Sequence, residues 1–349
     1  MVLIVVLAIL LASLMSFSIV DGISKADENI VKKNSLSLGH LSDIHYFPLH
    51  HCYQDVKADN YKTSDFYDSM TGDTKLVLES GIILKQQVEA LIKDAKDGKC
   101  PQFVLATGDL SKNGEATALV DVANSLRYMQ NEIRKIAGYE NFQVFATPGN
   151  HDLYNTSGAL YSQKDGSARK SDALSAMQFA LVFAGLGYPN ANLTGDDGAI
   201  DLTEYLPEDY WFGEFTKDYQ VSYNSDKVNI HYYNENLKAV ASKTTTAEKL
   251  ALYYAIGDVN NALSFSAEIL NPGLEDYSLL VIDASDRQAA DIGALVRINK
   301  SEYEALKAAG KAADFKYYLE KADGAINTDK EASADELARA LASGSHVYR

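Results

Sequence analysis

Residues with metal-binding side chains follow three short apolar runs of this chain. Each run ends in a small or turn-forming residue, and carboxylate, amide or imidazole groups come directly after it. The three ends are Asp43-Ile44-His45, Gly108-Asp109 and Gly149-Asn150-His151-Asp152. Carboxylate and imidazole ligands together suit Zn, Mn and Fe, and one carboxylate can bridge two ions. The pattern therefore predicts a site for two divalent metal ions, of which Mn, Zn or Fe are the candidates.

The spacing of these residues suggests which ion each of them would hold. Asp43 and His45 are two residues apart, so in an extended segment both would point to one side, toward the first ion. Asp109 follows the middle run and is the natural bridging ligand. Asn150 offers a neutral carbonyl oxygen to the second ion, and His151 beside it is left to move protons.

The segments that must position these side chains alternate between short apolar runs and longer stretches of helical periodicity. Strands are predicted over 36–41, 102–107 and 142–147, with helices over 75–96 and 115–136 between them. This order predicts adjacent parallel strands joined by right-handed crossovers. Because parallel strands share the edge at which they end, the three motifs should converge in one crevice.

The pattern loosens beyond residue 152. Further predicted elements are a helix over 171–184 and strands over 219–223, 263–269 and 277–282. The last two strands would form a hairpin through the turn Asn271-Pro272-Gly273. The whole of 36–349 is predicted as one domain, in which 285–349 is a mostly helical extension without a later strand.

Taken together, the three motifs resemble those of the calcineurin-like metallophosphoesterase family over roughly residues 36–283. The resemblance implies an α/β fold, a sandwich of two mixed β-sheets flanked by helices. It also implies hydrolysis of phosphomonoesters, phosphodiesters or related bonds with two metal ions. By this similarity, Asp43 and His45 hold the first metal, Asp109 bridges, Asn150 holds the second metal, and His151 stabilises or protonates the leaving group.

The chemistry of such a site follows from its composition. Two ions about 3.5 to 4 Å apart lower the pKa of a shared water and give a bridging hydroxide for in-line attack on phosphorus. His151, as general acid, would add a factor of about a hundred or more. Asp152 is the other candidate catalytic residue: it either orients His151 or caps the segment that follows.

The chain departs from the family pattern after Asp152. The family has a further histidine and then Gly-His-x-His, which complete both metal shells, whereas only His231 and His346 remain here. The fold is therefore predicted to be C-terminally incomplete, with the second ion weakly held unless His231 substitutes. The alternative function is a non-catalytic or truncated surface protein of the same fold that serves as a binding module.

Composition and the N-terminus bear on partners and location. Lys plus Arg number 32 against 48 for Asp plus Glu, a net charge of −16, which argues against nucleic acid as a bulk partner. A small phosphorylated substrate would need bound metal to offset that charge. Residues 1–22, whose first twenty carry no charge, are predicted as a signal peptide or membrane anchor, with 23–35 as linker. The protein would then be exported, as a secreted or membrane-anchored extracytoplasmic protein.

Overall fold

The computed structural model describes ten stretches of the chain. They are residues 36–49, 57–72, 75–189, 230–245, 248–249, 251–252, 263–268, 278–283, 294–322 and 324–349. The predicted N-terminal signal or anchor, the strand over 219–223 and the turn at 271–273 lie outside them. Across the described stretches, none of the helices has the length and apolarity needed to cross a membrane.

The first sheet is the predicted parallel one. It consists of β1 (Leu38–Leu41), β2 (Phe103–Thr107) and β3 (Gln143–Thr147), in the order β1-β2-β3. Leu41 pairs with Ala106, and Ala106 pairs with Ala146, so the three strands end at one edge. The central strand is β2, as the position of Asp109 requires.

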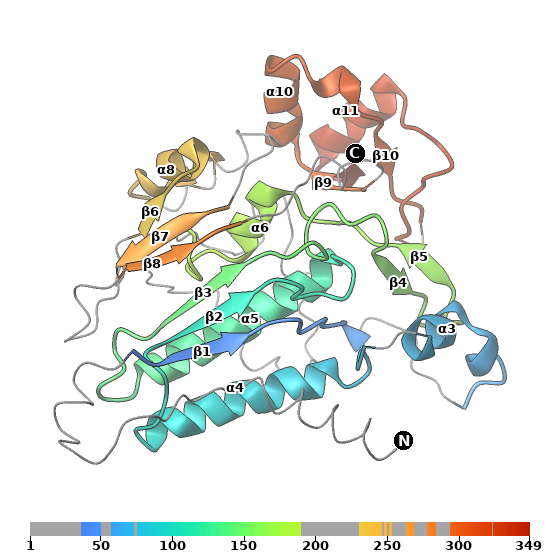
Figure 1. Ribbon diagram of the computed structural model, residues 1–349. Helices are drawn as coiled ribbons and strands as arrows, with labels where there is room; N and C mark the ends of the chain where they lie inside the picture. Colours follow the sequence, from blue (N-terminus) through green and yellow to red (C-terminus); the bar gives the residue numbers. More distant parts are fainter. Residues whose placement is uncertain are drawn as a thin grey trace, which may run out of the picture.

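Two long helices cover one face of this sheet (Figure 1): α4 (Ser80–Lys96) and α5 (Ala116–Arg134). The buried residues of α4 include Leu84, Val88 and Leu91, which recur at helical spacing and face the core. The helix begins five residues later than predicted. Val77, in the turn before it, packs instead into a separate apolar cluster with Phe47 and Phe66.

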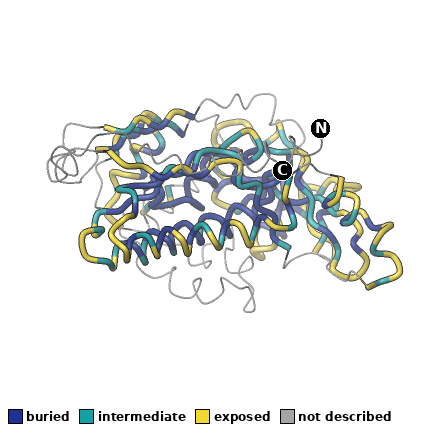
Figure 2. The backbone as a smooth tube through the Cα atoms, turned by 60° about the horizontal axis from the view of Figure 1, so that its bottom comes forward, coloured by how far each residue is buried: buried dark blue, intermediate teal, exposed yellow. Residues whose placement is uncertain are grey.

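The second sheet packs on the opposite face of the first. It is antiparallel and consists of β6 (Ile230–Tyr232), β7 (Phe265–Glu268) and β8 (Ser278–Val281). Pairing of β7 with β8 confirms the predicted hairpin strands. The ring of Phe265 lies 6.0 Å from that of Phe145 in β3 and 5.6 Å from that of Tyr188. These contacts make the two sheets a sandwich whose buried backbone lies in the middle of the molecule (Figure 2).

Short elements surround the end of the first sheet. They are η2 (Tyr61–Thr63), α3 (Asp65–Thr71), the hairpin of β4 (Ala159–Tyr161) with β5 (Ala168–Lys170), and α6 (Ala176–Val182). The short helix α8 (Glu235–Ala241) lies instead beside β6 of the second sheet. The prediction that a helix starts at residue 171 is wrong, because Ser175 and Gln178 form a capping box that starts α6 at Ala176.

The prediction of no strand after residue 283 is also wrong. The C-terminal segment consists of β9 (Arg297–Ile298), α10 (Lys300–Ala308), η5 (Ala312–Asp314), β10 (Tyr318–Leu319), α11 (Ala334–Ser343) and β11 (Val347–Tyr348). Its strands form an antiparallel sheet in the order β10-β11-β9. Strands of two residues are too short to show alternation, and their partners are far apart in the sequence. The two helices are therefore all that the local pattern reveals.

This segment is joined to the rest of the fold by hydrogen bonds. The backbone N–H of Ala173 donates to the carbonyl of Leu295 at 2.7 Å, and the Gln178 side chain donates to the carbonyl of Arg297 at 2.5 Å. Arg297 is itself buried and lies 3.7 Å from a carboxylate oxygen of Asp172. The C-terminal sheet is therefore anchored to the extended stretch just before α6.

Candidate metal centre

Three of the predicted ligands converge just beyond β1 and β2. Nε2 of His45 lies 3.9 Å from Oδ1 of Asp43 and 3.9 Å from Oδ2 of Asp109. One ligand atom from each residue lies within 4.8 Å of the others. Nitrogen and oxygen ligands bind zinc at about 2.0 to 2.2 Å, so two ligand atoms on one ion are at most about 4.3 Å apart. The His45 separations therefore fit a single shared ion.

The backbone reaches this arrangement in a way that the sequence did not suggest. Asp43, His45 and Asp109 have φ values of 51°, 44° and 48°, so all three are left-handed and none is extended. Each such residue costs about 1 to 2 kcal/mol relative to ordinary backbone. Two backbone hydrogen bonds help to hold the conformation, from Asp43 N to Gly108 O (3.2 Å) and from His45 N to Asp109 O (2.9 Å). Strain is thus concentrated at the candidate ligands.

Glycines let the second and third motifs approach each other. A Cβ on Gly149 would lie 2.3 Å from Oδ1 of Asp109 and 2.4 Å from its backbone nitrogen. Gly108 has a φ of 71° and packs against the Cα of Gly149. The Asp109 carboxylate is then oriented by His151, whose backbone N–H donates to Oδ1 at 3.1 Å. Oδ2 is left facing His45.

The ligand chemistry of the cluster suits a divalent ion. Burial, together with the nearby positive charge of Lys75, lowers the pKa of His45. The neutral imidazole that results is the form of histidine that binds metal. Two carboxylates beside it supply the negative charge, so this set of groups fits the metal that the motifs imply.

The imidazole of His151 borders the cluster. Its ring centroid lies 5.1 Å from that of His45 in an edge-on arrangement. Its Nδ1 lies 2.6 Å from the carbonyl oxygen of Lys112, so Nδ1 carries a proton and donates it. The opposite nitrogen, Nε2, lies 3.5 Å from Nζ of Lys75. No motif marks Lys75 in the sequence, and only the structure brings it here.

Asp152 lies beneath the site and is fully buried. Its carboxylate accepts hydrogen bonds from the backbone N–H groups of Leu110 (3.1 Å), Ser111 (2.9 Å) and Gly149 (2.8 Å), and from the Ser111 hydroxyl (2.8 Å). Burial raises the pKa of Asp152, and these donors act in the opposite direction. Of the two roles considered from the sequence, these contacts favour a structural one, which joins the loops that follow β2 and β3.

The remaining predicted residues lie in three different settings. Asn150 is exposed between Gly149 and His151, and it is not among the residues whose ligand atoms meet in the described cluster. His231 is exposed on β6 of the second sheet, with Nε2 3.9 Å from Glu268. His346 contacts Arg297 and Glu320 through its two ring nitrogens, at 2.9 and 2.8 Å. Neither later histidine joins the described metal cluster.

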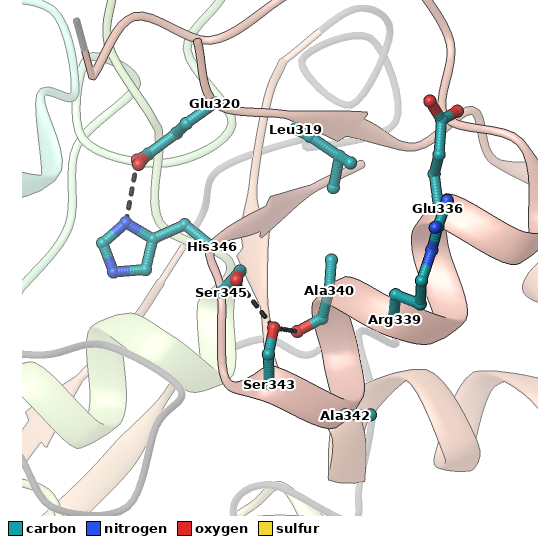
Figure 3. A pocket seen from close by; sticks show the side chains of 9 residues that line it. All are labelled: Leu319, Glu320, Glu336, Arg339, Ala340, Ala342, Ser343, Ser345 and His346. Carbon is teal, nitrogen blue, oxygen red and sulfur yellow. Dashed lines mark hydrogen bonds and ion pairs between the residues drawn. The ribbon is translucent and has the colours of Figure 1, made fainter. Parts of the chain in front are cut away.

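A hollow elsewhere on the described surface lies between the C-terminal sheet and α11 (Figure 3). Glu320 and His346 stand at one side of it, and Glu336 and Arg339 stand at the other. It belongs to the C-terminal segment and shares no residue with the metal cluster.

Comparison with known proteins agrees with this geometry. A family model described as calcineurin-like phosphoesterase matches residues 36–242, more than half of the 349-residue chain. A search of curated proteins finds no match. The matched region contains the whole parallel sheet, the metal cluster and His151. It supports a metal-dependent phosphoester hydrolase in general terms, and the chain belongs to the calcineurin-like phosphoesterase family.

Proposed function

We propose that this protein hydrolyses phosphate esters, monoesters or diesters, at a site for two divalent metal ions. The observation that supports this most is the convergence of Asp43, His45 and Asp109 beside His151. Asp43, His45 and Asp109 would hold one ion, and Asp109 with Asn150 would hold the other. When bound, the ions supply positive charge for the phosphoryl oxygens and an activated water.

His151 has two tasks in this proposal. The Lys112 carbonyl holds Nδ1–H of His151, so Nε2 is the nitrogen available to exchange a proton with the leaving-group oxygen. The His151 backbone N–H holds Oδ1 of Asp109 and keeps that carboxylate facing His45. The same residue therefore positions a ligand and handles the proton.

Substitution of the bridging ligand and of the proton-transfer residue tests this function. Asp109→Asn and His151→Ala should abolish hydrolysis of p-nitrophenyl phosphate and bis(p-nitrophenyl) phosphate by Mn- or Zn-loaded protein. Circular dichroism should show the fold retained, and Lys96→Met, at the far end of α4, serves as the control variant. Unchanged rates in both site variants would refute the mechanism.

Metal content tests the number of ions independently of turnover. Elemental analysis of protein loaded with Mn or Zn should find close to two ions per chain. One ion or none would refute the dinuclear site.

One structural observation favours a second candidate function. Among the described residues, His231 and His346 contact other groups and add nothing to the cluster. A non-catalytic binding module of the same fold would therefore be consistent with a sparse ligand set. Wild-type protein that binds phosphate but hydrolyses neither ester would support this alternative.

We also propose that the protein is exported and works outside the cytoplasm, secreted or anchored to a membrane. The charge-free first twenty residues support this proposal. N-terminal sequencing and fractionation of expressing cells test it, and unprocessed protein in the soluble cell fraction would refute it.

A further inference from the structure

The turn that precedes α4 brings a lysine to the metal centre. Lys75 is half-buried, and its Nζ lies 3.5 Å from Nε2 of His151. Two residues later, Val77 is buried in the cluster that contains Phe47. The backbone N–H of Phe47 also donates to the hydroxyl of Ser80 at 3.2 Å. Because Phe47 is only two residues beyond His45, these contacts tie the turn of Lys75 to the loop of the metal ligands.

The orientation of the His151 ring shows which of its atoms the Lys75 ammonium faces. Since Nδ1–H of His151 donates to the Lys112 carbonyl, Nε2 is the ring nitrogen that accepts from the ammonium of Lys75, at 3.5 Å. In the proposed function, Nε2 is also the atom that meets the leaving-group oxygen. A phosphate ester placed there is therefore within reach of the Lys75 ammonium.

Another nearby lysine is directed elsewhere. The side chain of Lys112 is buried, and its Nζ donates to the hydroxyl of Ser69 in α3 at 2.7 Å and lies 3.4 Å from the Ser69 carbonyl oxygen. Lys112 thus contributes its carbonyl to the site, whereas Lys75 contributes its charge. The chain has a net charge of −16, yet Lys75 places a positive charge beside His151, the proposed proton-transfer residue.

We propose that Lys75 contacts the phosphoryl group of the substrate and favours phosphates that carry two negative charges. This inference rests on the proposed function. A phosphomonoester carries a charge of about −1.5 to −2 at pH 7, whereas a diester carries about −1. Because Coulomb attraction scales with the product of the charges, the ammonium attracts the monoester about twice as strongly. Lys75 is thereby a substrate-contact residue that sets specificity.

The test compares Lys75→Met with Lys75→Arg and with the control Lys96→Met. Lys96 ends the same helix and is exposed, so its replacement removes the same charge at a distance from the site. Two quantities are measured on metal-loaded protein at pH 8. They are the Kd of inorganic phosphate by calorimetry, and kcat and KM for p-nitrophenyl phosphate and bis(p-nitrophenyl) phosphate.

Lys75→Met should weaken phosphate binding about tenfold or more, as expected for loss of a charge-assisted hydrogen bond. It should lower kcat/KM for the monoester by a clearly larger factor than for the diester. Lys75→Arg should restore part of the phosphate affinity and part of the kcat/KM for the monoester. Lys96→Met should leave these two quantities unchanged. Unchanged phosphate binding in Lys75→Met, or equal losses on the two esters, would overturn the proposal.

The calorimetric arm separates this inference from the proposed function. If the wild-type protein hydrolyses neither ester, the hydrolase proposal fails. The comparison of phosphate Kd values between wild type and Lys75→Met still tests whether Lys75 contacts a phosphate. Wild-type protein that binds no phosphate overturns the Lys75 contact itself. Thermal melts of each variant check that the fold is retained.

Discussion

A buried glutamate next to the metal loops should make the stability of the fold depend on pH. Glu115 comes six residues after Asp109, at the start of α5, and is 1% exposed. One of its carboxylate oxygens accepts a hydrogen bond from the backbone N–H of Asn113 at 2.9 Å. Burial raises the pKa of Glu115 from an ordinary 4.5 to about 7. The perturbation that isolates this group is Glu115→Gln, which keeps its shape and removes its titration.

The sign and size of this pH dependence follow from the difference in the pKa of Glu115 between the folded and unfolded states. Between pH 4.5 and about 7 the folded protein keeps the Glu115 proton while the unfolded chain loses it. The free energy of unfolding therefore falls by about 1.4 kcal/mol per pH unit over this window, and by about 3 kcal/mol in all. The stabilisation of the folded state by protonated Glu115 is fully present below pH 4.5 and is lost as the pH rises through about 7.

Urea denaturation at pH 5, 6, 7 and 8 measures this dependence. Glu115→Gln and wild type should differ least at pH 5, and the variant should gain up to about 3 kcal/mol on wild type by pH 8. Glu331→Gln, at an exposed glutamate, provides the matched control and should follow wild type throughout. If the difference between Glu115→Gln and wild type is the same at every pH, the argument from burial is refuted.

Three further predictions concern the loops of the metal centre. Gly149→Ala would place a Cβ against the Asp109 carboxylate, so the unfolding free energy should fall by about 1 to 3 kcal/mol and metal content should drop, as measured by urea denaturation and elemental analysis. Asp152→Ala would leave the buried donors of Leu110 and Ser111 without their acceptor and should cost about 3 kcal/mol or more in the same denaturation assay. Removal of metal with EDTA should lower Tm, because ligand at a hundredfold excess over its Kd stabilises the native state by about 2.7 kcal/mol.

Each of these predictions has a contrary outcome. Full metal content in Gly149→Ala would show that the loops can part without disturbing the ligands. Wild-type stability of Asp152→Ala would mean that this carboxylate does not join the loops. Equal Tm values with and without metal would show that the cluster does not bind an ion in the native state.

Local sequence patterns were enough to predict the parallel sheet and the approximate place of the site. The apolar runs that became β1, β2 and β3 are flanked by strongly periodic helices, and such local signals need no tertiary context. The motifs follow these runs directly, so the meeting of Asp43, His45 and Asp109 could be predicted from topology alone.

Other features depended on contacts between residues that are far apart in the chain. The left-handed backbone of Asp43 and His45 is supported by hydrogen bonds to the loop after β2, some 65 residues away, where an extended strand was expected. The two-residue strands of the C-terminal sheet exist only through mutual pairing.

The side-chain contacts at the site depend on distant segments in the same way. Asp152 accepts hydrogen bonds because folding surrounds it with donors from two loops. Lys75 reaches His151, 76 residues away, because apolar packing of Val77 beside Phe47 sets the turn before α4. The sequence shows which groups are chemically able to act. Only the packing of distant segments decides which of them meet, because such contacts leave no periodic trace in the local sequence.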